Sequence, residues 1–559
     1  MELSIPPVLE AFESDRPDHP MVVHRDREWT RSGFGERTRR FANVLLAHDV
    51  RAHGAFGEVP RWESVHDHVA LYLHNRPEYL EAMVGAWKAR AVPVNVNYRY
   101  VADELGHILR DSRAAAVVFE RRFGPTLAAA LEQASAAPRL LLWIEDGSAA
   151  PLLRGASEYE TALADADPTL PDDVVRSWTG DDLYICYTGG TTGLPKGATW
   201  RQADFLVGAL GVRHPERREF TSVDEVVATA GNRLRCLPAP PFMHGAAHWN
   251  AISCWFDGGT VVIQGSAHTV DPADLVQTVR DQRVDSLLLV GDPMARPLVD
   301  ELRAHPSALP TLRHVLSGGA VLSPDTRAAL LEVLPGVTVV DVLGSTESGR
   351  QGVARVSDPT DAGAPFTPSE GAVVLDAQRR RVLAPGEDEV GWLARSGRVP
   401  LGYLGDPDRT ASTFPVLAGV RYAVPGDRAQ WLADGSVRLL GRDSVCVNTG
   451  GEKVFVEEVE QAIRRHPAVA DVVVCGRPSD RWGEEVVAVV ELRDGHEVSD
   501  GQLLARAGET VARYKLPKVV LRVGHVVRSP SGKADYRWAR EVATGSTMPD
   551  PAQRRGLTP

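Results

Sequence analysis

The feature that most constrains the fold is a repeated alternation of short apolar runs with amphipathic stretches. Apolar runs of strand length occur at residues 68–75, 114–120, 140–146, 285–293, 314–320 and 337–347. Between the first three, residues 77–91 and 123–136 carry apolar side chains at helical spacing. This alternation is typical of an α/β architecture with largely parallel sheets.

The length of the chain and a change in its pattern of apolar residues indicate two domains. A chain of 559 residues is too long for a single hydrophobic core. Near Gly441 the pattern changes to one amphipathic helix, "VEEVEQAIRR", followed by the apolar runs "AVADVVVCG" and "EEVVAVVEL". We therefore predict a large N-terminal domain at residues 1–441, a small α+β domain at 442–545 and a loose polar tail at 546–559.

Composition excludes several classes of protein. The net charge of −12 disfavours a nucleic-acid partner, since an acidic surface repels phosphate. The five cysteines are scattered and form no C-x-x-C pair, which argues against a disulfide framework or a zinc site and fits a reducing cytoplasm. The first residues lack the basic and apolar stretches of a secretory signal, so we expect none, and no apolar run is long enough to span a membrane.

One segment, "YTGGTTGLPKGATW" at residues 187–200, combines glycines, threonines and a single lysine between a strand-like run and helix-like residues 203–211. Glycines let backbone N–H groups converge on an anion, hydroxyls add donors, and Lys196 adds charge. A Walker loop needs Gly-Lys-Ser/Thr, whereas Lys196 lies between Pro195 and Gly197. The pattern indicates a polyphosphate loop of another kind; the alternative is a plain hairpin turn.

The segment at 187–197 resembles the phosphate-binding signature of the adenylate-forming superfamily, which includes acyl-CoA synthetases, peptide-synthetase adenylation domains and luciferases. Further motifs of that superfamily follow in order at Pro240–Gly245 (PPFMHG), Leu343–Glu347 (LGSTE), Pro425–Asp427 (PGD), Gly441–Glu460, Tyr514–Lys518 and Ser529–Ala539. The strings "NTGGEKVF" and "SPSGKADYRWA" are most similar to actinobacterial long-chain and steroid-side-chain fatty-acid–CoA ligases.

The resemblance implies an enzyme that joins a carboxylate to AMP, expels pyrophosphate and lets the thiol of CoA displace AMP. It implies ATP, Mg²⁺ and CoA as cofactor and co-substrates, with a mobile C-terminal domain, and it is compatible with a homodimer. The catalytic set would be Lys533, Lys196, Thr346 and Glu347. Bringing two anions together requires positive charge at the meeting point, which suits Lys533.

The remaining roles follow the resemblance position by position. ATP and AMP would contact Thr188, Gly189, Gly190, Thr191, Thr192, Gly193, Lys196, Gly318, Gly319, Leu343, Gly344, Ser345, Thr346, Asp427, Arg442 and Lys533. The acyl pocket would include His244, Gly245, Gly319, Gly349 and Arg350. The passage for CoA would be Gly450, Gly451 and Glu452, the hinge Ser444, and the metal ligand Glu347, because Mg²⁺ prefers carboxylate, water and phosphate oxygens.

Three positions depart from the superfamily pattern. Leu343 replaces the aromatic residue that stacks on adenine in many relatives, so apolar packing is expected there. Ser444 replaces the usual hinge aspartate or lysine. Arg350 follows the expected metal carboxylate and lies near the expected acyl entrance, where a purely apolar substrate has no use for a positive charge; a solvent-facing role is the alternative.

Three functional hypotheses remain open at this level. The first is a carboxylate–CoA ligase for a bulky hydrophobic or aromatic acid. The second is an ATP-dependent diazotase that activates nitrite and diazotises an aryl amine, which Arg350 favours and the Gly450-Gly451 passage disfavours. The third is a catalytically silent binding protein, against which Lys196, Glu347, Asp427 and Lys533 count.

Overall fold

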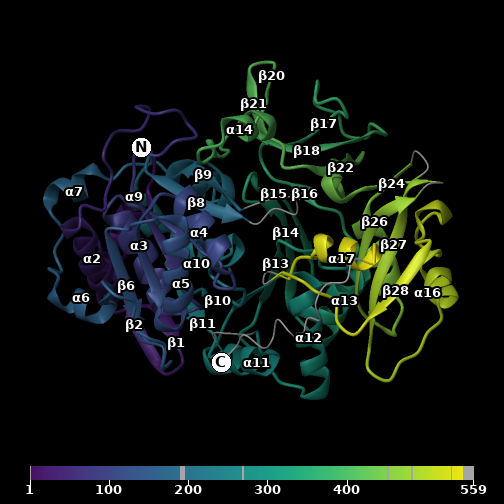
Figure 1. Ribbon diagram of the computed structural model, residues 1–559, viewed down its shortest axis with the longest axis horizontal. Coiled ribbons are helices and arrows are strands. Elements are labelled where there is room, and N and C mark those ends of the chain that lie inside the picture. The colour runs from purple at the N-terminus through teal and green to yellow at the C-terminus, as the bar shows by residue number, and fades with distance from the viewer. Residues whose placement is uncertain are drawn as a thin grey trace. The chain divides into compact units, whose positions relative to one another are not determined.

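The structure is a computed structural model, and it describes residues 2–188, 195–266, 270–449, 452–479, 482–529 and 532–545. The chain forms two compact units, one of residues 1–373 and 394–425, the other of residues 374–393 and 426–559 (Figure 1). The last crossing of the chain from the first unit to the second is at 425/426, whereas the sequence pattern changes near Gly441. The predicted domain boundary at 441/442 marks the expected pivot of a domain rotation, which the division into compact units does not test, so it stays a prediction.

The first unit contains a nine-stranded sheet with a parallel centre. Its strands, in spatial order, are β16 (Thr367–Pro368), β15 (Gly349–Val356), β14 (Thr338–Ser345), β13 (His314–Gly318), β12 (Ser286–Leu289), β10 (Arg235–Pro238), β11 (Thr260–Ile263), β1 (Pro20–His24) and β2 (Arg27–Thr30). The strands from β14 to β1 pair in parallel, and both edges pair antiparallel.

A second sheet of this unit is parallel throughout, in the order β4 (Val92–Asn95), β3 (His68–Tyr72), β5 (Ala114–Glu120), β6 (Leu140–Ile144) and β7 (Ser157–Glu158). The strands β3 and β5 are buried along their whole length, which explains their uninterrupted apolar sequences. A third, antiparallel sheet has the order β19 (Gly402–Tyr403), β9 (Lys196–Arg201) and β8 (Leu183–Thr188).

Helices cover these sheets. They are α1 (Ile5–Asp15), α2 (Arg31–Ala47), α3 (Pro77–Lys88), α4 (Ala102–Asp111), α5 (Gly124–Ala134), α6 (Tyr159–Asp165), α7 (Asp172–Ser177), α8 (Gln202–Phe205), α9 (Val223–Thr229), α10 (Gly245–Phe256), α11 (Pro272–Asp281), α12 (Gly291–Ala304), α13 (Pro324–Val333) and α14 (Pro407–Thr413). Helix α2 packs against both α3 and α6, as Figure 1 shows. None of the helices in the described part of the chain is long and apolar enough to cross a membrane.

Shorter elements complete the first unit: the 3₁₀ turns η1 (Arg121–Phe123) and η3 (Pro359–Asp361), the π-helix η2 (Leu206–Leu210), and the strands β20 (Val416–Leu417) and β21 (Val420–Ala423). Strands β17 (Ala372–Leu375) and β18 (Val390–Ser396) each run through a point where the chain passes between units. The predicted α/β class with mainly parallel sheets is confirmed.

The second unit is built around the sheet β25 (Glu452–Val454), β24 (Val447–Thr449), β27 (Gly483–Leu492) and β26 (Val469–Ser479), with β28 (Val519–Val523) beside β27. Its other elements are β22 (Asp427–Trp431), β23 (Val437–Arg442), η4 (Asp443–Val445), α15 (Val456–Arg464), α16 (Asp500–Ala507), η5 (Arg513–Lys515) and α17 (Tyr536–Ala543). Val472 and Val474 pack with α15 and α16, whereas Val473 and Cys475 pack with α17. Because both faces are covered, "VVVC" is apolar without alternation. The α+β composition predicted for this region is confirmed.

A buried carboxyl lies where α15 packs against β23. Glu457 is in the first turn of α15, and its Oε1 accepts a hydrogen bond from the Arg442 amide at 3.4 Å. A Cβ on Gly441, whose φ is +129°, would lie 2.4 Å from Glu457 Oε2, so glycine is required there. Burial, reinforced by the charge of Asp427, raises the pKa of Glu457 to about 7.

This carboxyl makes stability depend on pH. The folded state binds more protons than the unfolded one between the ordinary pKa near 4.5 and the raised value near 7, so its contribution is present below 4.5 and is lost as pH rises through 7. We expect Glu457→Gln to raise the melting temperature by a few degrees at pH 8.5 and not at pH 5. Thermal denaturation at both pH values measures this.

The matched control is Glu497→Gln, because Glu497 is an exposed glutamate of the same unit. That variant should melt like the wild type at both pH values. An equal shift for Glu457→Gln at pH 5 and pH 8.5 would contradict the assignment of a raised pKa to this carboxyl.

Candidate active site

The lysine of the glycine- and threonine-rich segment lies at the start of a buried strand. Strands β8 and β9 form an antiparallel hairpin in which Thr188 is opposite Lys196. The residues 189–194 that connect them lie outside the described residues, so the predicted contacts of Gly189, Gly190, Thr191, Thr192 and Gly193 stay predictions. The residues after Lys196 form strand β9 before the helical segment begins. The lysine therefore stands on a strand that is paired on both edges.

A buried amide joins the hairpin to the PPFMHG segment. Asn95, at the end of β4, donates from Nδ2 to the carbonyl oxygens of Tyr187 (2.9 Å) and Met243 (2.7 Å), and its Oδ1 accepts from the Tyr187 amide (2.7 Å). Asn75 binds the same segment: its Nδ2 donates to Pro240 O (3.0 Å), and its Oδ1 accepts from the Phe242 amide (2.6 Å). These bonds hold the end of β8 close to the residues that precede His244.

Behind His244, which caps α10, the side chains form a closed aromatic cluster. The Tyr184 hydroxyl hydrogen-bonds to His248 Nε2 and Trp249 Nε1, both at 2.5 Å, and the Tyr184 ring stacks on Phe205 with centroids 4.0 Å apart. Burial lowers the pKa of His248 to about 4, so this imidazole is neutral. A Cβ on Gly245 would only touch Trp249 and Cys186, at 3.4 and 3.5 Å. All five cysteines are buried, as expected.

The predicted nucleotide-contacting glycines lie at the carboxyl ends of adjacent parallel strands. Gly318 ends β13 opposite Val342 of β14, and Gly319 follows it with φ +87°. A Cβ on Gly319 would meet nothing within 4 Å, so backbone conformation selects glycine there. Leu343, Gly344 and Ser345 form the end of β14. In an open α/β sheet, ligands bind at this carboxyl edge.

The turn between β14 and β15 carries Thr346 and Glu347, and β9 and β19 hold it. The Trp200 indole N–H of β9 donates to Thr346 O at 3.0 Å. The Tyr403 hydroxyl of β19 donates to Glu347 Oε1 at 3.1 Å. Burial and the Glu347 charge raise the pKa of Tyr403, which keeps it a donor.

The surroundings of Glu347 are compatible with a magnesium ion that takes its other ligands from substrate phosphates and water. No group of three or more potential metal ligands of the His, Cys, Asp and Glu types occurs among the residues described. Mg²⁺ is commonly bound by one or two carboxylates together with substrate phosphates and water. A partly exposed glutamate with one oxygen held by Tyr403 suits that mode of binding.

Lys196 and Glu347 both contact one short segment, Gly402–Asp406. Lys196 Nζ lies 2.6 Å from Asp406 Oδ2, and the Tyr403 ring centroid is 6.0 Å from Nζ. Sequence reasoning missed both Tyr403 and Asp406. The only signal was the Asp-Pro pair at 406–407, which is typical of a helix start and says nothing about a lysine partner.

Arg350 is partly buried instead of facing solvent. Its guanidinium occupies the place that a side chain on Gly211, at the end of η2, would fill. Within the described ranges it has no carboxylate in ion-pair contact. Burial and the nearby Arg355 and Arg213 lower its pKa. Among the described residues, a positive charge without a carboxylate partner therefore lies next to the turn that carries Glu347.

A second arginine fastens β15 to the π-helix. Arg395 is 4% exposed, and its Nη1 donates to Ser348 O (3.2 Å), Arg350 O (3.1 Å) and Gly208 O. Burial and the charge of Arg350 lower the pKa of Arg395 to about 10. The π-helix η2 also packs against α10, so it links the helix behind His244 to the strand that carries Arg350.

The two residues predicted to hold the ribose, Asp427 and Arg442, contact each other in the second unit. Asp427 and Arg442 are opposite each other on β22 and β23, with Arg442 Nε 3.2 Å from Asp427 Oδ1. The Asp427 side chain is largely buried. Glu457 lies against the same strand end, through its bond to the Arg442 amide. The pair is positioned by a hairpin and the helix behind it.

Lys533 is exposed on a turn of the second unit. Its amide donates to Ser529 Oγ at 3.1 Å, and its carbonyl accepts from the Ser529 amide at 2.8 Å. Arg528 anchors this turn through a 2.7 Å hydrogen bond to Asp471. An exposed lysine on an anchored turn can reach a ligand without rearranging its own support.

The remaining predicted positions are described only in part. Ser444 lies in the 3₁₀ turn η4, and Glu452 begins β25. Gly450 and Gly451 lie outside the described residues, so the CoA passage stays a prediction.

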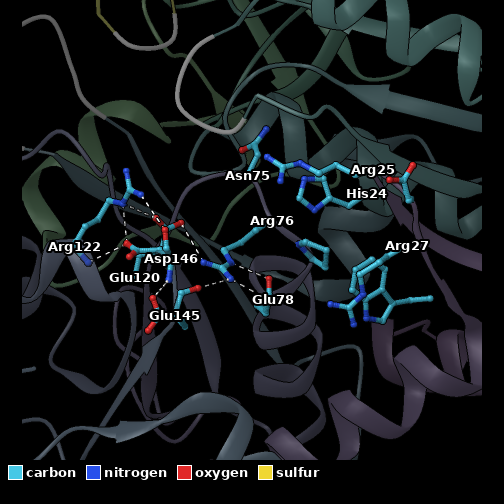
Figure 2. A pocket seen from close by; sticks show the side chains of 13 residues that line it. His24, Arg25, Arg27, Asn75, Arg76, Glu78, Glu120, Arg122, Glu145 and Asp146 are labelled. Carbon is cyan, nitrogen blue, oxygen red and sulfur yellow. Dashed lines mark hydrogen bonds and ion pairs between the residues drawn. The ribbon is translucent and has the colours of Figure 1, made fainter. Parts of the chain in front are cut away.

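A polar pocket of about 490 Å³, which sequence reasoning did not find, lies at the carboxyl ends of β3, β5 and β6 beside the β1–β2 turn (Figure 2). Two of its carboxylates pair with arginines: Arg76 Nε is 2.8 Å from Glu78, and Arg122 Nε is 2.7 Å from Asp146. Figure 2 shows these pairs on one wall, with His24 and Arg25 on the opposite side. The lining contains four arginines and five carboxylates, so it has no excess positive charge for a phosphate.

Comparison with known proteins identifies the family of the chain. A protein-family model described as AMP-binding enzyme matches residues 9–404, and one described as AMP-binding enzyme C-terminal domain matches residues 458–533. The medium-chain acyl-CoA ligase Mig of Mycobacterium avium is 45% identical over 97% of this chain and 98% of its own length. The 3-oxocholest-4-en-26-oate–CoA ligase of Rhodococcus rhodochrous is 37% identical over 100% of this chain and 98% of its own.

Among solved structures, the anthranilate CoA ligase AuaEII in complex with anthranoyl-AMP aligns with a TM-score of 0.79 at 22% identity, covering 97% of this chain and 98% of that one. At that identity the likeness supports the fold alone. The family models and the two relatives span nearly the whole sequence, and the chain therefore belongs to the AMP-binding enzyme family.

Proposed function

We propose that the chain is an ATP-dependent carboxylate–CoA ligase acting on a bulky hydrophobic or aromatic acid. It forms an acyl-adenylate and then an acyl-CoA thioester, and it releases pyrophosphate and AMP. The observation that carries this proposal is the position of Lys196 and Glu347, both held by the segment Gly402–Asp406 beside the carboxyl edge of the main sheet. The names of the two relatives support CoA as acceptor and an extended apolar acid as substrate. Nothing in them favours a nitrite-activating diazotase.

In the first half-reaction, a carboxylate oxygen attacks the α-phosphorus of ATP and pyrophosphate leaves. Lys196 and Thr188 hold the outer phosphates, and Thr346 contacts the α-phosphate. Glu347 would hold the magnesium ion, which would neutralise charge on the phosphates when bound. Lys533 offsets the repulsion between carboxylate and phosphate where they meet. Asp427 and Arg442 hold the ribose, while Leu343 packs against adenine.

In the second half-reaction, the CoA sulfur attacks the acyl carbonyl and AMP leaves. We assign the approach of the thiol to Gly450 and Gly451, where only glycine permits close passage. Lys533 and the thiol need the same side of the adenylate, so the C-terminal domain rotates about Ser444 between the steps, a hinge closure of the usual kind. The assignment of a cytoplasmic enzyme belongs to this proposal too, as does a homodimeric assembly.

The function is tested with a panel of acids. The wild type is incubated with ATP, Mg²⁺, CoA and medium-chain, steroid-side-chain or aromatic acids, and AMP and thioester are quantified separately. We expect one AMP per thioester for at least one bulky apolar acid. Without CoA, exchange of pyrophosphate into ATP should continue. Release of AMP only with nitrite and an amino-aryl acid, with no thioester from any acid, would contradict the proposal.

Lys533→Ala should separate the half-reactions. Because a lost electrostatic donor costs about 10²–10³ in rate, adenylate formation should fall by at least that factor. Thioester formation from a presynthesised acyl-adenylate should stay nearly normal. Arg506→Ala, at an exposed basic residue of the same unit outside the quoted motifs, is the control and should leave both steps unchanged. Equal loss in both half-reactions of Lys533→Ala would argue against the assigned role.

We infer that Arg350 adds a specificity to this function, by donating a hydrogen bond to a polar acceptor on the acyl group. A hydrogen bond to a charged group contributes about 1.5–3 kcal/mol, or about 10- to 100-fold. Arg350→Leu should lower kcat/KM by such a factor for an ω-oxo or ω-carboxy acid and leave a plain acid of equal length nearly unaffected. Arg355→Leu, at an exposed arginine of the same strand, is the control. Equal losses for both acids would show that Arg350 only supports the fold.

A further inference from the structure

The lysine of the predicted phosphate loop has a carboxylate partner of its own. Lys196 Nζ lies 2.6 Å from Asp406 Oδ2, and the two side chains are 28% and 31% exposed. A lysine that binds polyphosphate does not need this carboxylate, whose charge competes with that of the phosphates. The pair therefore needs an explanation beyond phosphate binding.

Asp406 is fixed by one carboxylate oxygen and pairs with Lys196 through the other. It is the N-cap of α14, where Oδ1 accepts a hydrogen bond from the Arg409 amide at 2.9 Å. Burial acts to raise the pKa of Asp406, but the bonds from Lys196 and the Arg409 amide outweigh it and lower the pKa. The carboxylate is thus ionised at neutral pH, and it can release Lys196 without losing its place at the helix end.

The segment that carries Asp406 also holds the predicted metal ligand. The Tyr403 hydroxyl donates to Glu347 Oε1 at 3.1 Å. Strand β19, which contains Tyr403, pairs with β9 directly after Lys196, with Tyr403 opposite Ala198. The Leu404 amide adds a bond to Gly197 O at 2.8 Å. Lys196 therefore meets Asp406 in a fixed frame.

The Lys196–Asp406 ion pair is weak enough for a phosphate group to displace the carboxylate. A partly exposed ion pair shifts an equilibrium by about fivefold or less, because water screens both charges. A polyphosphate carries several negative charges and accepts shorter, stronger hydrogen bonds from an ammonium group. It can displace Asp406 from Lys196 at low cost, and Asp406 can take the lysine back when the phosphate leaves.

We propose that Asp406 is the resting counter-ion of Lys196, displaced by the triphosphate on binding and recaptured as pyrophosphate departs. Asp406 is then a positioning residue that keeps pyrophosphate from binding too tightly. This inference rests on the proposed function, since it takes the ligand of Lys196 to be the phosphates of ATP.

The test is Asp406→Asn, which keeps the size and the capping oxygen and removes the charge. We expect the inhibition constant of pyrophosphate against ATP, and the KM for ATP, each to fall by about two- to fivefold. Asp408→Asn is the matched control, because Asp408 is exposed in the first turn of the same helix and carries the same charge. It should leave both constants unchanged.

Asp406→Ser, which keeps a capping oxygen, should reproduce the tighter pyrophosphate inhibition if the asparagine variant does not fold. Calorimetric titration with Mg·ATP separates the two levels of inference. If the wild type does not bind ATP, the proposed function is wrong. If wild type and Asp406→Asn bind ATP and pyrophosphate equally, or Asp408→Asn shows the same change, only the counter-ion role is overturned.

Discussion

The hydrogen bonds that join β9 to β8 on one side and to β19 on the other determine the geometry of the candidate site. Through β8, Lys196 is placed opposite Thr188 at the mouth of the predicted phosphate loop. Through β19, the same strand brings in the segment that contacts both Lys196 and Glu347. Trp200, also on β9, fixes the turn that carries Thr346. A shift in this pairing would separate the groups that we propose bind one triphosphate.

Around β9, buried backbone carbonyl and amide groups are satisfied by hydrogen bonds from specific polar side chains. Asn95 and Asn75 bind loop carbonyl and amide groups that no strand satisfies. Unsatisfied polar groups are costly in an interior, so these amides select one conformation of the PPFMHG segment. Arg395 does the same for the π-helix by donating to three carbonyl oxygens. The walls of the site are thus set by backbone contacts as much as by apolar packing.

Two charged side chains near the candidate site, Arg350 and Glu457, have neighbours of the same sign. Arg350 has neighbours of like sign, and Glu457 is buried beside Asp427. Such arrangements cost stability and commonly occur at functional sites, where environment shifts the pKa. Both lie next to predicted ligand-binding residues, Arg350 after Glu347 and Glu457 against Arg442. A ligand with complementary polarity would offset part of that cost.

The sequence by itself determined the α/β class, the small C-terminal α+β region and the superfamily, because apolar periodicity and ordered motifs are local properties of the chain. It also identified Lys196, Glu347, Asp427 and Arg442, and the structure places the last two opposite each other. The roles of these residues in the reaction stay predictions. Gly450, Gly451 and most of the phosphate loop lie outside the described residues.

Tertiary structure alone decided how Lys196 and Glu347 are held. Lys196 and Asp406 are 210 residues apart in the chain, and Tyr403 and Glu347 are 56 apart. No local pattern encodes such contacts, because they arise only when β19 pairs with β9. The burial of Arg350 was likewise undetermined by sequence, since it depends on the packing of η2 against β15. Local sequence specifies which groups are available, and strand pairing across long separations specifies which of them meet.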